Sequence, residues 1–187
     1  MKQSGHHFVY GSLRDYLTGE ELPDTDDERF RQQLARLLVE EKGFTKEELE
    51  PRLVIETLFG TAFVRSVIDL TISLNGEQRL LVLRYGPGSL VTREKPALAA
   101  ARLLDPVCCI PLAVVTNGLD AELLETAAGR VLATGMTAAL PDRAQLAKLA
   151  AQHPPRPPLT SAERERNLRV LNAFDREVCC QKERCGR

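Results

Sequence analysis

The chain has 187 residues, a net charge of −1 and a hydrophobic content of 43%, which suits one soluble domain with a terminal extension. The near-neutral charge excludes attraction to nucleic acid by a global basic field, so such binding would need a local patch. We identify neither an apolar run of membrane-spanning length nor an export signal. We therefore expect a cytoplasmic protein without membrane contact.

The N-terminal part contains an irregular segment followed by the clearest helix of the sequence. Residues 1–24 are rich in glycine, aromatic and turn-forming residues, and we expect them to wrap the surface or to form a short helix. Residues 24–43 begin with aspartates that can cap a helix and end at a glycine. Glu28 lies in the first turn, where a carboxylate suits the helix dipole and can pair with Arg31. The apolar residues recur at i, i+4, i+7 and i+8 and predict one helical stripe: Phe30, Leu34, Leu37 and Leu38.

Three strands follow this helix. Residues 51–60, 62–74 and 78–85 alternate in the manner of β-strands, and Asn75-Gly76 predicts a tight hairpin turn between the last two. Asp69 lies inside the second strand, where a buried acid needs a partner or a task. Its carboxylate therefore belongs either to a functional site or to a structural ion pair.

The second half predicts helices and strands in alternation. We expect helices at 92–104, 120–129 and 142–152, and strands at 108–118 and 130–134. The strand at 108–118 is apolar throughout, as in a strand that is buried on both faces of a mixed or parallel sheet. The pattern predicts an α/β domain around a mixed sheet.

The C-terminal part is set apart by prolines. Residues 153–159, HPPRPPL, predict a semi-rigid extended linker, and a helix is expected at 160–178, beginning at a capping box. We therefore divide the chain into a domain at 1–152, the linker at 153–159, and a helix with a cysteine-containing tail at 160–187.

The chain contains five cysteines, an odd number that argues against a framework of disulfides. Cys179, Cys180 and Cys185, with Cys108 or Cys109 as a fourth ligand, could hold zinc or an iron–sulfur cluster. The spacing is not C-x-x-C, however. The alternative is that the first pair are small buried hydrophobic residues and that the tail thiols are solvated.

Four segments carry a resemblance to a known family: DERFRQQLARLLVEEKGF, VIDLTI, LLVLRYGPGSL and PLAVVTNG, within roughly residues 24–133. In their order they resemble the N-terminal nuclease domain of the R subunit of type I restriction enzymes. The most specific points are Glu28, Asp69 and Thr116-Asn117-Gly118. The resemblance implies the PD-(D/E)xK nuclease superfamily and its restriction-endonuclease-like fold: a mixed β-sheet flanked by helices, here followed by a C-terminal helical extension.

The resemblance also implies a magnesium site, and here the sequence departs from it. The family carries glutamate, any residue and then lysine on the third strand; alignment on the Gly-Pro-Gly turn places Leu83 and Tyr85 at these positions. Asp69 would remain as a metal ligand and Glu28 as the accessory acid of the helix. Leucine offers no oxygen to magnesium, and tyrosine carries no positive charge at neutral pH. The site is therefore expected to be degenerate, without magnesium-dependent cleavage by this route.

The register of the hairpin leaves two arrangements open. A two-residue turn places Asp69 opposite Val82, with Arg84 diagonally on the same face, where it could form an ion pair with Asp69. A bulge or a longer loop would instead turn Leu83 and Tyr85 toward Asp69, and Arg84 away from it.

Three functions are consistent with these patterns. The first is a nuclease-like domain that has lost catalysis and acts as a DNA-associated or protein-interaction module, with DNA, a second copy of the chain or another protein as partner. The second is an active endonuclease with a rearranged site, to which Glu94 or Lys95 could contribute migrated groups. The third is a metal or iron–sulfur protein whose ligands are the cysteines.

Overall fold

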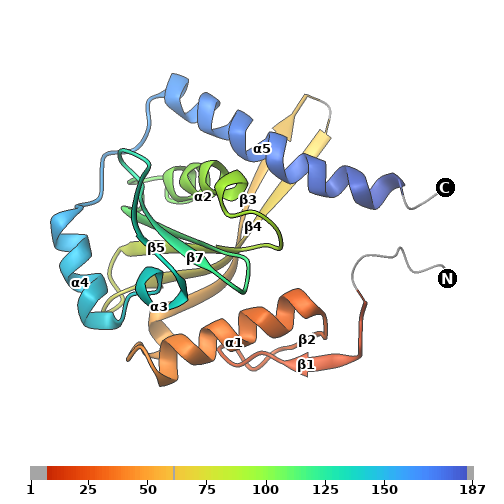
Figure 1. Cartoon of the computed structure of the whole chain (residues 1–187). Helices are drawn as coiled ribbons and strands as arrows, with labels where there is room; N and C mark the ends of the chain where they lie inside the picture. Colours follow the sequence, from red (N-terminus) through yellow and green to blue (C-terminus); the bar gives the residue numbers. More distant parts are fainter. Residues whose placement is uncertain (1–7, 61, 185–187) are drawn as a thin grey trace.

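A mixed six-stranded sheet forms the centre of the protein in the computed structural model, which describes residues 8–60 and 62–184 (Figure 1). The strands follow one another across the sheet in chain order, and a two-stranded sheet precedes them. The large sheet consists of β3 (Leu49–Phe59), β4 (Ala62–Ser73), β5 (Arg79–Tyr85), β6 (Leu112–Thr116), β7 (Ala121–Glu125) and β8 (Arg130–Thr134). The α/β class and the mixed sheet predicted from the sequence are confirmed.

Only β5 and β6 pair in parallel, among the described strands, and helix α2 (Val91–Leu103) makes the crossover between them. A parallel pair needs such a connection, because the chain must return to the edge where the first strand began. Strand β6 is buried at every position, as its apolar sequence predicted.

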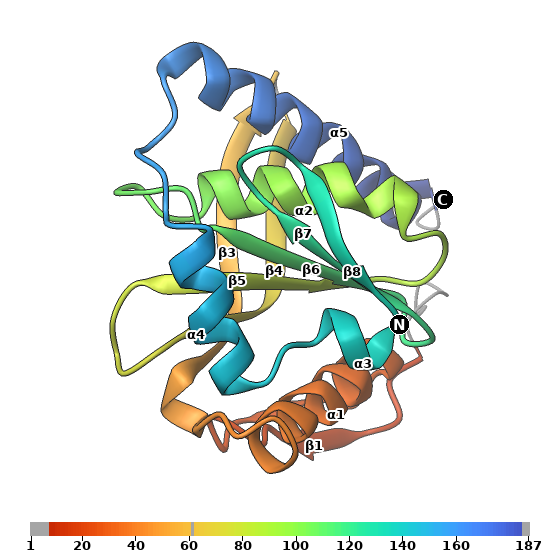
Figure 2. The same cartoon turned by 60° about the vertical axis from the view of Figure 1, so that its left-hand side comes forward.

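Helices cover both faces of the sheet (Figure 2). Helix α1 (Asp26–Glu40) lies on one face, where Leu34 and Leu38 join the same buried cluster as Leu70 and Leu83 of the sheet. The short helix α3 (Met136–Ala139) and helix α4 (Arg143–Gln152) also contribute to this cluster. Helix α2 and helix α5 (Ser161–Arg184) cover the opposite face.

Helix α1 begins where the capping aspartates predicted, with Thr25 as the N-cap residue. The Thr25 hydroxyl accepts a hydrogen bond from the Glu28 amide, which satisfies one of the free amides of the first turn. The acidic first turn, Asp26 to Glu28, suits the helix dipole. This start fixes the position of Glu28 in the first turn of the helix.

Helix α5 packs along α2 and along the β3–β4 hairpin (Figure 1). Leu171 is fully buried in the cluster of that face, and Asn172 accepts a 2.6 Å hydrogen bond from the Thr57 hydroxyl of β3. Among the described residues, no helix is long and apolar enough to cross a membrane.

Two predicted elements differ from the structure. Residues 120–129, predicted as a helix, contain strand β7 and a turn, since pairing with β6 and β8 outweighs the helix propensity of alanine, glutamate and leucine. Within residues 1–24, the described part forms no helix; it contains a short hairpin of β1 (Ser12–Arg14) and β2 (Glu21–Pro23). Residues 1–7 lie outside the described part.

The β3–β4 hairpin changes face in its middle. Leu70 lies in the cluster under α1, whereas Ile68 lies in the cluster under α2 and α5. Alternate residues of a regular strand share a face, so the strand must turn at the residue between them, Asp69. Opposite this point, Arg52 adopts a left-handed backbone conformation with φ 56°, uncommon for a residue with a side chain. This turn allows the Asp69 carboxylate to reach helix α1.

Candidate functional site

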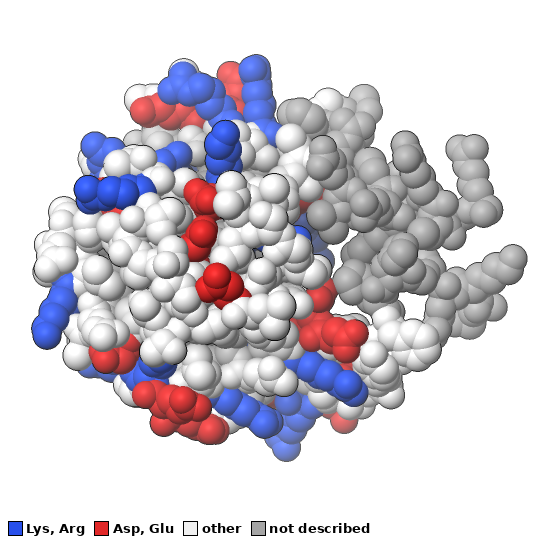
Figure 3. Space-filling model, in the orientation of Figure 1, with Lys and Arg blue, Asp and Glu red and all other residues white. Residues whose placement is uncertain are grey.

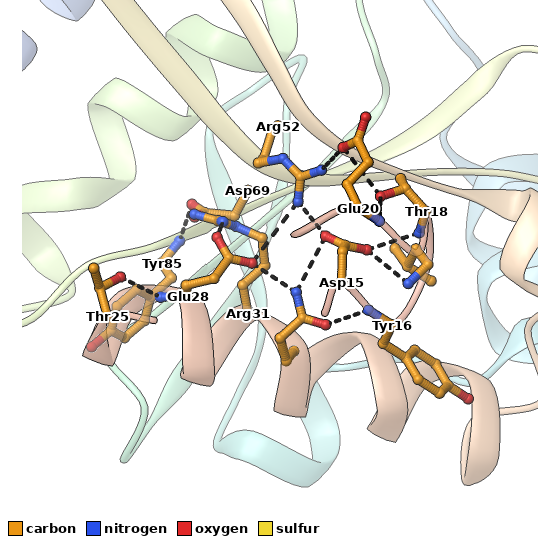
Figure 4. Close-up of polar contacts among 12 residues, drawn as sticks. Asp15, Tyr16, Thr18, Glu20, Thr25, Glu28, Arg31, Arg52, Asp69 and Tyr85 are labelled. Atoms are coloured by element: carbon orange, nitrogen blue, oxygen red, sulfur yellow. Dashed lines mark hydrogen bonds and ion pairs between the residues drawn. The ribbon is translucent and has the colours of Figure 1, made fainter. Parts of the chain in front are cut away.

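Acidic and arginine side chains from three parts of the chain meet where the β3–β4 hairpin changes face (Figure 4). We call this group the acid–arginine cluster: Asp15, Glu28, Arg31, Arg52 and Asp69. Asp15 follows β1, two members lie on α1, and the last two lie on β3 and β4. The cluster therefore unites segments that are far apart in the sequence.

Asp69 is buried and is bonded on both carboxylate oxygens. Arg31 donates to Oδ1 from Nε and Nη2, at 3.3 and 3.1 Å, and the backbone amide of Tyr85 donates to Oδ2 at 2.7 Å. Burial raises the pKa of Asp69 above its ordinary value, while the charge of Arg31 and the amide of Tyr85 oppose this rise. The carboxylate thus has a structural ion pair, which was one of the two predicted explanations for its position.

Glu28 is the second acid that Arg31 contacts. Its carboxylate accepts from Arg31 Nη1 and, at 2.7 Å, from the side-chain amide of Gln32. The predicted pairing of Glu28 with Arg31 is confirmed. The Arg31 guanidinium therefore lies between two carboxylates, all three side chains being 10 to 11% exposed.

Asp15 and Arg52 extend the cluster, although no pattern in the sequence marked either of them. The Asp15 carboxylate accepts from Arg52 Nη1, from Gln32 Nε2 at 3.2 Å, and from the amides of Leu17 and Thr18. Burial by itself raises the pKa of Asp15, but Arg52 and the two amides outweigh it and hold this pKa below its ordinary value. Figure 4 shows the Arg52 guanidinium turned toward both Asp15 and Glu28.

The hairpin register determines how β5 faces this cluster. The tight turn at Asn75-Gly76 forms, since the Glu77 amide donates to the Leu74 carbonyl, but a bulge between Ile72 and Ser73 shifts the pairing. As a result Val82 lies opposite Thr71 and not opposite Asp69. The arrangement with a bulge is therefore the one that the structure adopts.

Arg84 points away from Asp69, as expected for the arrangement with a bulge, and the ion pair of the other arrangement does not form. Its guanidinium donates at 3.0 Å to Asp175 of α5, on the opposite face of the sheet. Leu83 and Tyr85 lie on the α1 face. Leu83 is fully buried in the α1 cluster, and the Tyr85 ring stacks on Phe30 with 4.2 Å between centroids.

The two residues considered as replacements for the missing ligands, Glu94 and Lys95, lie elsewhere. Glu94, in the first turn of α2, is near Glu122 of β7 and helps to raise the pKa of that carboxyl, after burial as the main cause. Lys95 is exposed. Over the described part of the chain, neither residue contacts Glu28 or Asp69.

The cysteines fall into a buried pair and a C-terminal group. Cys108 and Cys109 are buried free thiols, and burial raises the pKa of both. Cys185 and the side chains of Cys179 and Cys180 lie outside the described residues. Within the described residues, no group of three or more histidine, cysteine or acidic side chains has an arrangement that could hold a metal ion.

A comparison with protein families gives a match to one model. The model of the type I restriction enzyme R protein N terminus (HSDR_N) matches residues 26–139. The chain belongs to this family. No match was found among curated proteins or among solved structures.

The family region runs from the first residue of α1 to the last residue of α3. It contains Glu28, Arg31, Arg52 and Asp69, which make up most of the acid–arginine cluster of this type I restriction enzyme R domain. Asp15 precedes the region, and helices α4 and α5 follow it. The cluster is thus completed by a residue outside the part that defines the family.

Proposed function

We propose that this type I restriction enzyme R domain keeps the framework of a PD-(D/E)xK nuclease, has lost magnesium-dependent cleavage, and acts as a DNA-associated or protein-interaction module. The family match and the mixed sheet support the framework. The contents of the acid–arginine cluster support the loss of cleavage.

The observation that carries the proposal is the position of Arg31. In a nuclease of this superfamily, the strand acid would hold magnesium, which polarises the scissile phosphate. Here the guanidinium of Arg31 pairs with both Glu28 and Asp69. It supplies the positive charge that these buried carboxylates require, but it cannot ligate or polarise a phosphate and a water as a metal ion does.

Leu83 and Tyr85 support the same conclusion. Leu83 has no exposed surface and packs in the core, so it cannot provide an oxygen ligand. Burial is the main cause that raises the pKa of Tyr85, and the negative charges of Asp27 and Asp26 raise it further. The Tyr85 hydroxyl is therefore neutral at physiological pH. Two carboxylates that Arg31 already pairs are a poor magnesium ligand set. Loss of a positioned proton-transfer group by itself costs about 10²- to 10⁴-fold in rate.

Association with DNA is expected to be weak, and its affinity is expected to fall with a shallow slope as the salt concentration rises. The net charge is −1, and Figure 3 shows lysines and arginines scattered around a broad neutral area that also carries acids. Without a continuous basic surface on this face, a few phosphate contacts would dominate the binding. Fluorescence anisotropy with labelled duplex and single strands at several salt concentrations measures this directly.

Cleavage is tested on supercoiled plasmid and single-stranded DNA with magnesium or manganese. We expect no cleavage above the level of an Asp69→Asn variant, which serves as the matched control. Metal-dependent nicking by the natural protein that the variant lacks would establish the rearranged active site instead. Metal analysis and the visible spectrum of anaerobically purified protein test the cysteine-ligated alternative in the same preparation.

The proposed alignment of β5 can be tested by rebuilding the site. Arg31→Ala, Leu83→Glu and Tyr85→Lys together remove the guanidinium and restore the glutamate and lysine implied by the superfamily. We expect manganese to raise the melting temperature of this triple variant but not that of the natural protein. The matched control is Arg31→Ala with Leu83→Gln and Tyr85→Lys, whose melting temperature manganese should also leave unchanged. A folded triple variant whose melting temperature changes with neither magnesium nor manganese would show that the alignment is wrong.

A further inference from the structure

A cavity of about 720 Å³ lies beneath the proline-rich segment 153–159 and shares no residue with the acid–arginine cluster. Its volume is within the range of pockets that hold small molecules and cofactors. Apolar residues line part of it, together with three arginines, two glutamates and a histidine. The residues that line it include Arg102, Thr126, Arg156, Pro157, Leu159 and Arg166.

Hydrogen bonds between distant segments build the wall of this cavity. Arg102 of α2 donates from Nε and Nη2 to the Thr126 carbonyl, at 2.9 and 2.6 Å, and from Nη1 to Asn167 of α5 at 3.4 Å. The amide of Cys109 donates to the Arg156 carbonyl at 2.9 Å and so ties the proline-rich segment to the domain. The cavity is therefore formed before any ligand arrives, which lowers the entropy cost of binding.

The two arginines at its edge differ from the other charged groups. The side chains of Arg156 and Arg166 are exposed and, among the described residues, take part in no hydrogen bond or ion pair. Their guanidinium groups therefore keep all their donors for a ligand. Guanidinium donors of this kind suit an anion with several oxygens.

The two acids of the lining do not cancel this positive charge. Glu163 accepts a 2.6 Å hydrogen bond from the Thr160 hydroxyl, and Glu125 lies 3.7 Å from His153. Hydrogen bonds from Thr160 are the main cause of the lowered pKa of Glu163, and the charges of Arg166 and Arg156 add to it. One carboxylate near two guanidinium groups leaves this edge of the cavity positive.

Thr126 belongs to the wall of the cavity. It is 1% exposed and lines the cavity, and its hydroxyl has no hydrogen-bond partner within the described structure. Buried hydroxyl groups in folded proteins are generally paired, since an unpaired one loses its hydration without compensation. Because the residue is almost fully buried, its hydroxyl lies inside the wall, behind the cavity surface, and is out of reach of a ligand.

We propose that this cavity binds a small organic phosphate, of the size of a nucleoside monophosphate or a sugar phosphate. Arg156 and Arg166 bind the phosphate, because guanidinium groups match the geometry of phosphate oxygens. The organic part lies against Pro157 and Leu159, which line the cavity and have accessible surface. This site is separate from the proposed nuclease-derived function and does not depend on it.

The test uses the full chain with AMP, glucose 6-phosphate and inorganic pyrophosphate as separate probes. We expect AMP or glucose 6-phosphate to raise the melting temperature in a concentration-dependent manner, because a ligand that binds only the folded state stabilises it. Titration calorimetry then gives the dissociation constant. Arg156→Gln with Arg166→Gln should weaken binding at least about tenfold, given the usual contribution of hydrogen bonds to charged groups.

Two further variants make the result decisive. Arg164→Gln, on an exposed position of α5 that does not line the cavity, should leave binding unchanged. Thr126→Val removes the buried unpaired hydroxyl at nearly constant volume and should also leave binding unchanged, because this hydroxyl does not reach the cavity surface. The proposal is overturned if no probe has an effect, if pyrophosphate alone binds, or if the double arginine variant binds as the natural protein does.

Discussion

Replacing Arg31 with methionine removes the guanidinium that lies between Glu28 and Asp69 and keeps much of the side-chain volume. The three side chains are 10 to 11% exposed, so water cannot replace the lost partner. Removing one member of a buried ion pair typically costs about 3 to 5 kcal/mol, because the remaining charge stays buried and unpaired. Here two carboxylates are left, and we expect a loss in the upper half of this range.

Urea unfolding, followed by circular dichroism, measures the loss. With an m-value of about 2 kcal/mol/M, a loss of about 4 kcal/mol lowers the midpoint by about 2 M. Arg36→Met on the exposed side of the same helix is the matched control, and we expect it to cost under about 1 kcal/mol. A loss of similar size in both variants would refute the idea that Arg31 neutralises buried acids.

The pH dependence of Arg31→Met gives an independent check. Burial raises the pKa of Asp69, and Arg31 is the strongest of the interactions that oppose this rise. Without Arg31 the folded pKa rises further above the unfolded value. The native state then binds more protons than the unfolded state between these two values, so stability falls as pH rises through that window. The loss of unfolding free energy in Arg31→Met should therefore be smaller at pH 5 than at pH 7.5. Adding Asp69→Asn to this variant should reduce the loss further.

Three further variants test other parts of the molecule. Asp15→Asn should cost about 2 kcal/mol in the free energy of unfolding at pH 7. Because the folded pKa of Asp15 is lowered, this stability should fade as the pH falls below about 4. Glu48→Gln should cost about 1 to 3 kcal/mol and show the same direction with pH, since the hydrogen bond from Arg143 lowers the Glu48 pKa. Leu171→Ala should cost about 2 to 5 kcal/mol in the free energy of unfolding, because Leu171 is fully buried. A negligible cost for this variant would show that α5 is only loosely attached. Chemical denaturation measures all three variants.

The elements with a clear local pattern were predictable. The stripe of Leu34 and Leu38 predicted helix α1, and the apolar run before Thr116 predicted a strand buried on both faces. The segment 120–129 was not predictable in this way, because its residues favour a helix in isolation. This segment forms a strand because it pairs with the free edge of β6 and with the strand that follows. Such pairing partners cannot be recognised from a short stretch of sequence.

The candidate site was predictable only for the residues with a local signal. Asp69 was identified because an acid within an apolar strand requires an explanation, and Glu28 because it begins a helix in the family pattern. Asp15 and Arg52 gave no such signal, since charged residues in a loop and near the start of a strand are common. Their importance depends on burial, which the fold alone produces.

The amino-acid sequence by itself determined helix α1, the buried strand β6, the turn at Asn75-Gly76, and the absence of a glutamate and a lysine from β5. These features depend on side chains a few residues apart, whose spacing is fixed by the covalent chain. The tertiary structure alone decided that Arg31 pairs with Asp69 and that Arg84 turns to Asp175. A bulge of the hairpin and the packing of two helices from opposite faces set those partners, and both result from the balance of burial over the whole domain.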